Sequence, residues 1–421
     1  MQRQMRGSWE SSFWGTTFWG TTGNRLTHLT ALIGLSLSSF GCGGAGTVPP
    51  GPKSLAFAPA TSFSSGGTTP GSVVVADFNG DGKLDIAVSN FNSNAIAVFL
   101  NKGDGTFENP IVSPVQITAL GLGAIAVGDF NQDGKPDLVV GTIGGLQADI
   151  VLLGNGDGTF RQLPPISNSG GFLRARVVDL NGDGHPDLVT GNNGNISVYL
   201  GRGDGTFTGV ALIPTFSLPG AYFGIVVGDF NGDQKLDIVA SDIGPSFPPS
   251  PVGTLVFYAG NSDGTFQAPT VVQFPPSLPG SLASADFNGD GKLDLLIGYP
   301  NMAGIAWGNG DGTFQTGLGK LVPVYSTMNF VLNGGGMILQ TADFNLDGKP
   351  DAVVGDFHLG ILTLVLNDGI GKVPPASGTQ FQFTLAPGIN DIAVGDLNGD
   401  GIPDIVVSNG TTNQISVILS K

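Results

Sequence analysis

Aspartate residues recur through the chain in one fixed pattern that could bind a metal ion. The nine-residue string Asp-Phe/Leu-Asn-x-Asp-x-x-x-Asp occurs seven times, beginning at Asp77 and recurring at intervals of 50–57 residues. Positions 1, 3, 5 and 9 of each string supply side-chain oxygens, and position 7 can supply its backbone carbonyl. Alternating oxygen donors around a tight turn can wrap one hard cation, as an EF-hand loop does. The pattern therefore predicts up to seven structural Ca²⁺ ions as cofactors, because Mg²⁺ accepts a flexible all-protein cage less readily.

The predicted metal donors occupy the same five positions in every copy. They are Asp77, Asn79, Asp81, Lys83 and Asp85; Asp129, Asn131, Asp133, Lys135 and Asp137; Asp179, Asn181, Asp183, His185 and Asp187; Asp229, Asn231, Asp233, Lys235 and Asp237; Asp286, Asn288, Asp290, Lys292 and Asp294; Asp343, Asn345, Asp347, Lys349 and Asp351; and Asp396, Asn398, Asp400, Ile402 and Asp404. The variety at position 7 suits a ligand that uses only its carbonyl.

The alternative for these strings is a set of Asx-turns that cap hairpins without metal. Three carboxylates would then repel one another within each loop, whereas seven Ca²⁺ would bring the formal net charge from −16 to −2. The fourth copy has Gln234 where the others have glycine. Because a left-handed turn strains a residue that carries a side chain, we predict the weakest metal site there.

The elements between these strings predict an all-β fold. In the first unit, strands are expected at Ser72–Ala76, Leu84–Ser89, Ala95–Leu100 and Phe107–Val115. A second motif, close to Gly-Asn-Gly-Asp-Gly-Thr-Phe, supplies a hairpin turn in each of the first five units. Four antiparallel strands per unit, repeated seven times, are typical of a β-propeller. We therefore expect a seven-bladed β-propeller of four-stranded antiparallel blades.

The two ends of the propeller are predicted to meet in its last blade. The seventh unit has only three expected strands before Lys421, and the segment Leu55–Phe63 resembles the start of a fourth strand elsewhere in the chain. The N-terminal strand should therefore close the last blade and leave no open sheet edge. The predicted organisation is an export signal over residues 1–42, a Gly/Pro linker over 43–53 and the propeller over 54–421.

The N-terminal segment predicts export. Its apolar stretch Leu29–Phe40 is too short to cross a bilayer and fits the core of a signal peptide, although that core begins late and leaves the true start open. The run ending at Cys42 resembles the end of a bacterial lipoprotein signal, which implies lipidation of Cys42. An ordinary cleaved signal is the alternative, since Ser39 stands where Leu, Val or Ile is usual. We expect a protein of the bacterial cell envelope or exterior, with membrane contact only through a lipid anchor at Cys42.

The repeats resemble FG-GAP/VCBS repeats and are similar to the seven-bladed propeller of integrin α-subunits. The Asp strings carry this resemblance, which covers residues 54–421. It implies calcium in the loop between strands 1 and 2 of a blade. It also implies a cell-surface adhesion or ligand-binding module rather than one particular chemistry.

A ligand is expected on the face opposite the Asp loops, where loops vary in length. The partner expected there is a protein or a glycan, because exposed aromatic side chains suit such contacts. The candidates are Phe216, Tyr222, Phe247, Tyr299, Phe330 and His358. The alternative is that most of these rings fill space between blades. Arg174 and Arg176, on one face of an innermost strand, are expected to line the central channel and meet an anion, or to pair with Asp391 or Asp179.

Charge and residue types limit the remaining function classes. A net charge of −16 excludes nucleic acid as a partner, since binding to phosphates requires a basic surface. We predict no enzymatic activity, because the chain lacks a G-x-S-x-G string and has only three His and one Cys. A polysaccharide-binding lectin and a polysaccharide lyase or hydrolase remain the alternatives. The protein is expected to be a monomer.

Overall fold

The computed structural model describes a propeller that begins at Leu55. The described residues are 55–145, 148–166, 171–172, 174–192, 195–213, 222–242, 254–273, 279–299, 303–315, 337–367 and 380–421. They contain 27 β-strands and no helix. Consistently, no helix within these ranges has the length and hydropathy needed to cross a bilayer. The predicted signal, the linker and Cys42 lie outside the described residues.

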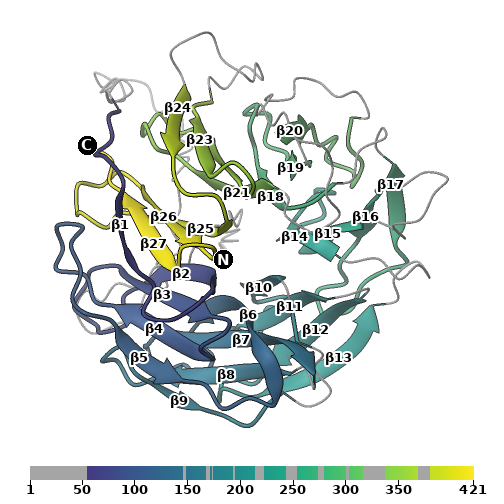
Figure 1. Cartoon of the computed structure of the whole chain (residues 1–421). Helices are drawn as coiled ribbons and strands as arrows, with labels where there is room; N and C mark the ends of the chain where they lie inside the picture. Colours follow the sequence, from purple (N-terminus) through teal and green to yellow (C-terminus); the bar gives the residue numbers. More distant parts are fainter. Residues whose placement is uncertain are drawn as a thin grey trace, which may run out of the picture.

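Seven antiparallel sheets form a ring around a central axis, so the predicted propeller is confirmed (Figure 1). Within each blade, consecutive strands run from the axis to the rim. Blades 1 to 3 comprise β2 (Pro70–Ala76), β3 (Asp85–Asn90), β4 (Ala95–Phe99) and β5 (Ile111–Pro114); β6 (Ala119–Gly128), β7 (Asp137–Gly145), β8 (Asp149–Gly154) and β9 (Phe160–Gln162); and β10 (Arg174–Val178), β11 (Asp187–Asn192), β12 (Asn195–Gly201) and β13 (Phe207–Ile213).

The remaining blades follow the same order, and blade 5 has three strands within the described residues. Blades 4 to 7 comprise β14 (Tyr222–Gly228), β15 (Asp237–Asp242), β16 (Thr254–Tyr258) and β17 (Thr270–Gln273); β18 (Leu282–Ala285), β19 (Asp294–Gly298) and β20 (Ala303–Ala306); β21 (Met337–Ala342), β22 (Asp351–Asp356), β23 (Ile361–Val365) and β24 (Gln380–Thr384); and β25 (Ile389–Gly395), β26 (Asp404–Asn409), β27 (Gln414–Ile418) and β1 (Thr61–Ser64).

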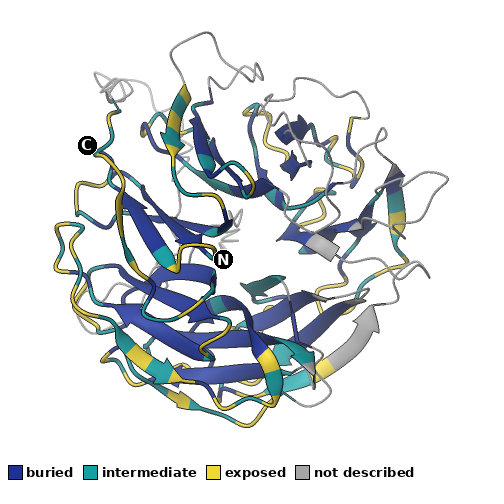
Figure 2. Ribbon diagram, viewed as in Figure 1, coloured by how far each residue is buried: buried dark blue, intermediate teal, exposed yellow. Residues whose placement is uncertain are grey.

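The hydrophobic core lies between the blades. Strands 2 and 3 of a blade are covered on both faces by the neighbouring blades. Every residue of β3 and β4 is therefore buried, and these strands lack the alternation of apolar and polar residues seen in half-exposed strands. Outer strands alternate instead, and β24 is exposed at every second residue. Figure 2 shows the buried inner strands and the exposed rim. Each apolar cluster joins two neighbouring blades, as the one containing Ile96 of blade 1 and Leu138 of blade 2 does.

The N-terminal strand closes the ring, as predicted. β1 pairs antiparallel with β27, with Thr61 opposite Val417 and Ser64 opposite Gln414. The ladder continues through an isolated bridge between Phe57 and Ser420. Blade 7 therefore contains the first and the last described strands of the chain. β1 covers the outer edge of β27, which would otherwise be an unpaired strand edge.

Candidate functional site

Each Asp loop joins strands 1 and 2 of a blade and is organised by its own side chains. In the first loop, Asp77 Oδ1 accepts hydrogen bonds from the amides of Gly80 (2.7 Å) and Asp81 (3.0 Å), and Oδ2 accepts one from Gly82 (2.8 Å). Asn79 Oδ1 accepts the amide of Asp81 at 2.9 Å, and Asp81 Oδ1 accepts that of Lys83 at 3.0 Å. These contacts coil the backbone around the oxygen side chains. The bonds from position 5 to position 3 and from position 7 to position 5 recur in all seven loops.

The aspartate at position 9 holds the loop to the rest of its blade. Asp85 is completely buried. Its Oδ2 accepts the amide of Phe78 at position 2 (2.9 Å), and its Oδ1 accepts the amide of Asn101 just after strand 3 (2.8 Å). The same pair of bonds occurs at Asp137, Asp187, Asp237, Asp294, Asp351 and Asp404. This clamp was not predicted from the sequence, which gave position 9 only a role in metal binding.

The loops concentrate negative charge. Burial, with the nearby charges of Asp77 and Asp81, raises the pKa of Asp85 to about 7 despite its two amide contacts. Asp351 shows the largest effect of this kind, with a pKa raised to about 8 by burial and then by Asp343 and Asp347. A bound cation would relieve this repulsion. Each carboxylate also keeps acceptor capacity beyond the amide bonds it makes, since it has about four lone-pair sites.

The donor set of each loop fits a hard, oxygen-liganded cation such as Ca²⁺. Positions 1 and 5 supply carboxylates and position 3 supplies an amide oxygen. The backbone carbonyl of position 7 and the buried Asp at position 9 are the remaining oxygen donors. In the described part of the chain, no cluster of three or more Asp, Glu, His or Cys side chains is arranged to hold a metal by those groups alone.

The Asp loops also connect neighbouring blades. The turn of the second motif donates to the preceding blade's Asp loop: Gly158 N bonds the carbonyl of Phe78 at 3.1 Å, and Gly205 N bonds that of Phe130 at 2.8 Å. Aromatic rings also meet across this interface. The ring of Phe78 packs edge to face on the ring of Phe160 in the next blade, with the ring centroids 5.8 Å apart. Any ion that rigidifies an Asp loop thus also braces an interface between blades.

The position 7 side chains of four loops pack against the second motif. At Lys83, Lys135 and Lys235 the ammonium also pairs with the position 5 Asp of its own loop, as Lys83 Nζ does with Asp81 Oδ2 at 3.3 Å. The stem of Lys83 covers Gly103 of the second motif so closely that a Cβ there would lie 2.9 Å from it. Lys135, His185 and Lys292 cover the equivalent glycine in blades 2, 3 and 5. The glycine before the Asp of the second motif also has a positive φ in these blades, as at Gly103 (+92°), and this conformation favours glycine.

Gln234 adopts the left-handed conformation expected for its position, with φ +66°, whereas glycine fills that place in the other six loops. We expect Gln234→Gly to raise the free energy of unfolding by about 1 kcal/mol, because the left-handed strain of a residue with a Cβ is released. Chemical denaturation of the variant and the parent measures this difference in the free energy of unfolding. Gln132→Gly is the matched control: Gln132 also has a positive φ (+57°), but its side chain donates to the carbonyl of Gly184 at 2.9 Å. We expect a smaller gain from Gln132→Gly, because that change also removes this hydrogen bond. A Gln234→Gly variant that is no more stable than the parent would contradict the strain argument.

The opposite face contains only part of the predicted ligand set. His358 is exposed in the turn between β22 and β23, where its ring contacts Phe357 edge to face. Tyr222 begins β14, opposite Asp242. The expectation for Tyr299 is corrected: it is 2% exposed and packs between blades 4 and 5, so it cannot meet a ligand. Phe216, Phe247 and Phe330 lie outside the described residues.

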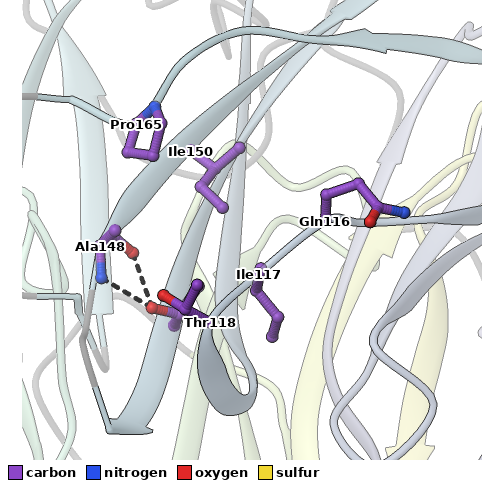
Figure 3. A pocket seen from close by; sticks show the side chains of 7 residues that line it. Gln116, Ile117, Thr118, Ala148, Ile150 and Pro165 are labelled. Atoms are coloured by element: carbon purple, nitrogen blue, oxygen red, sulfur yellow. Dashed lines mark hydrogen bonds between the residues drawn. The ribbon is translucent and has the colours of Figure 1, made fainter.

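A cavity of about 280 Å³ opens on this opposite face, between blades 1 and 2 (Figure 3). It lies between the β5–β6 connection and the β7–β8 hairpin, and it is lined by Gln116, Ile117, Thr118, Thr142, Ala148, Ile150 and Pro165. None of these side chains is charged, so the cavity suits a neutral group with both apolar and hydrogen-bonding parts. The sequence did not predict this cavity, because the ligand candidates were mainly aromatic residues and its lining contains none.

Asp149, beside the cavity wall at Ala148 and Ile150, predicts a pH effect on stability. Burial raises the pKa of its carboxyl to about 7. The unfolded carboxyl ionises near pH 4, so Asp149 increasingly destabilises the fold as the pH rises from about 4 to 7. We expect Asp149→Asn to be more stable than the parent by about 2 kcal/mol at pH 8 and nearly equal to it at pH 4.

Denaturation across this pH range tests the prediction, with Asp157→Asn as the control. Bonds from the hydroxyl and amide of Thr159 lower the pKa of the exposed Asp157, so this variant should lose stability at neutral pH and not in acid. A difference between Asp149→Asn and the parent that does not change with pH would contradict the assignment.

Similar proteins support the architecture. Two integrin subunits of Drosophila melanogaster match short segments: integrin alpha-PS3 is 42% identical over 80 residues and integrin alpha-PS5 is 40% identical over 98 residues. These segments cover 17% and 21% of this chain but only 7% and 10% of the relatives' lengths. The match is thus confined to a small part of each integrin subunit.

Two solved structures share the fold over most of the chain. One, from a study of how an Agrocybe aegerita lectin recognises non-reducing terminal N-acetylglucosamine, has a TM-score of 0.51 and 21% identity, covering 81% of this chain and 86% of that one. The other, BBS1N in complex with ARL6DN, has a TM-score of 0.53 and 14% identity, covering 86% and 96%. At these identities the likeness concerns the fold.

The family assignment rests on the repeats themselves. The profile of the FG-GAP-like repeat matches residues 49–88, 77–140, 141–190, 179–240, 249–297, 286–354 and 343–407, and that of the FG-GAP repeat matches residues 122–159. These matches span nearly the whole propeller, and each includes part or all of an Asp loop. The chain therefore belongs to the family of FG-GAP-like repeat proteins.

Proposed function

We propose that this protein is an exported, calcium-stabilised propeller that binds a protein or glycan ligand on the face opposite its Asp loops. The observation that carries this proposal is the sevenfold repetition of one oxygen-rich loop at the blade interfaces. That repetition makes the Asp-loop face structural. The opposite face is the one where blades differ, and differences between blades are what a specific ligand can recognise.

The cavity between blades 1 and 2 supports a site on that face. The side chains of Gln116 and Thr118 are exposed at its edge, while Ile117, Ile150 and Pro165 supply apolar surface. A neutral polar group with an apolar side, such as a sugar ring or a peptide segment, matches this lining. The likeness to a lectin fold and to integrin segments agrees with a binding role but does not name the ligand.

The test is a binding screen of the full chain on glycan and polysaccharide arrays, together with capture of partners from cell-envelope extracts. Each is run in millimolar Ca²⁺ and again in excess EDTA. We expect saturable binding in calcium that falls in EDTA as the fold loosens. A turnover assay on any polysaccharide that binds separates a lectin from a lyase or hydrolase.

Two variants locate the ligand. Thr118→Trp should fill the mouth of the cavity and abolish binding without a large change in melting temperature. Thr384→Trp, the same change at an exposed position of the outer strand β24, should leave binding intact. Folded, calcium-loaded protein that binds nothing in either screen would contradict the ligand-binding role, and unchanged binding by Thr118→Trp would move the site elsewhere.

A further inference from the structure

The floor of the cavity between blades 1 and 2 belongs to the apolar core. Ile150 of β8 lines the cavity, is 2% exposed and is part of the apolar cluster that joins the two blades. Ile117 of the β5–β6 connection also lines the cavity, and it packs against the same cluster. An apolar group that entered the cavity would therefore extend a packed interface that already exists between the blades.

Much of the polar lining is already paired within the protein. The hydroxyl of Thr142 donates to the carbonyl of Ala148 at 3.0 Å and accepts the amide of the same residue at 2.7 Å, as the dashed lines in Figure 3 show. The backbone of Gln116 is held from the outer strand β9: its amide donates to Gln162 Oε1 at 2.8 Å, and its carbonyl accepts Gln162 Nε2 at 2.9 Å. These contacts fix the wall and leave the exposed side chains of Gln116 and Thr118 to meet a ligand.

Of the two proposed ligand classes, a protein suits this lining better than a glycan. A sugar that enters a cavity needs a new hydrogen bond for each hydroxyl that it withdraws from water, because an unpaired buried polar group is costly. The side chains of Gln116 and Thr118 are too few for a whole sugar ring. None of the seven lining residues is charged, which also disfavours an acidic or a basic group. An uncharged aliphatic side chain has neither requirement.

An exposed leucine lies beside the cavity. Leu120 at the start of β6 is 72% exposed, the highest value for a large hydrophobic side chain among the described residues. It lies against Gly144 of β7, where an added Cβ would be 2.6 Å from the leucine side chain. Thr118 and Thr142, which line the cavity, are each two residues away along these strands, so Leu120 lies on the same face of blade 2. Exposed apolar surface next to a cavity is typical of a protein-binding site.

We propose that this cavity anchors a protein partner, which inserts one uncharged aliphatic side chain, such as leucine, and covers Leu120 with its flanking residues. This inference rests on the proposed ligand-binding role of this face and narrows the ligand from a protein or a glycan to a protein. The neutral lining matches an uncharged anchor in a chain whose net charge is −16, and its floor continues the interface between blades 1 and 2. The centre of a protein–protein interface is likewise poor in charge and is held by a few buried side chains.

The experiment observes the isoleucine methyl groups of the full chain in calcium by NMR. Ile117 and Ile150 report on the cavity, and the variants Ile117→Val and Ile150→Val assign their signals. The probes are capped tripeptides with leucine, serine, glutamate or lysine between two glycines, and N-acetylglucosamine. We expect the leucine peptide to shift both signals saturably, and every other probe to bind about tenfold more weakly or worse.

Leu120→Ser should weaken binding of the leucine peptide about threefold, because it removes apolar surface beside the cavity. Val112→Ser is the matched control, since Val112 is also an exposed apolar residue but lies on the outer strand β5, and it should bind like the parent. Equal binding by these two variants would remove Leu120 from the site.

The proposal is overturned if the leucine peptide leaves both methyl signals unchanged, or if the serine peptide binds equally well. It is also overturned if N-acetylglucosamine shifts the two signals at lower concentration than the leucine peptide, since the cavity would then be part of a glycan site. The array and capture screens test the ligand-binding role of the face separately, so ligand binding there combined with a failure of the leucine peptide would contradict this inference alone.

Discussion

Removal of calcium is expected to lower the melting temperature of the propeller by about 10 °C. Extracellular calcium modules bind at roughly 10⁻⁴–10⁻³ M, so each site contributes about 1 kcal/mol at millimolar calcium. Seven such contributions are comparable with the whole stability of a domain, about 5–15 kcal/mol. The effect on the melting temperature is moderated by the large unfolding entropy of a chain of this length.

The structure indicates where this loss would act. The carbonyl of Phe78 in the first Asp loop accepts a bond from Gly158 of the next blade, and its ring packs on Phe160. A loop released from its ion would be pushed open by its own carboxylates, and the contact between blades would weaken with it. Removal of the ions should therefore loosen the ring at several interfaces at once.

Scanning calorimetry in 1 mM Ca²⁺ and in excess EDTA measures the effect. Readdition of Ca²⁺ should restore the original melting temperature, whereas Mg²⁺ at the same concentration should restore little of it. Identical melting curves in calcium and EDTA would rule out structural calcium. Calcium titration of Gln234→Gly beside the parent would also test the prediction that the fourth loop binds most weakly.

Deletion of residues 55–64 should destabilise the propeller by about 5 kcal/mol or more, far beyond the effect of trimming an ordinary terminus. This segment supplies the outer strand of blade 7, and its two phenylalanines reach different neighbours. Phe57 packs edge to face on Phe381 (5.1 Å) and Phe383 (5.2 Å) of blade 6. Phe63 packs on Phe99 (5.2 Å) of blade 1. The segment thus fastens blade 7 on both sides.

Deletion of residues 44–53 from the predicted linker is a control of equal length. Chemical denaturation should show a large loss for the first deletion and little change for the second. Single variants refine the result: Phe57→Ala and Phe63→Ala should each cost about 2–3 kcal/mol, because each ring is partly buried between blades. Equal stability of the two deletions would show that the ring does not depend on its N-terminal strand.

The sequence by itself determined the features that repeat. The Asp strings at fixed intervals predicted seven blades and the position of every oxygen-rich loop, because a loop's hydrogen bonds connect residues only two to seven positions apart. The missing fourth strand of the last unit also predicted the closure by Leu55–Phe63. The second role of Asp85, as a clamp to strand 3, lay beyond this reasoning, since its partner Asn101 is 16 residues away.

Only the tertiary structure decided what happens between blades. Tyr299 looked like an exposed ring on a variable loop, yet the neighbouring blade buries it. The cavity is lined by Gln116 from the β5–β6 connection and by Thr142 from β7 of the next blade. No sequence pattern in either segment predicts that they lie together. Arg176 donates to the carbonyl of Ala175, and in the described residues it forms no ion pair with Asp391 or Asp179, the partners that the sequence offered. Burial and pairing depend on which surfaces face each other across a blade junction, and local spacing along the chain does not encode that.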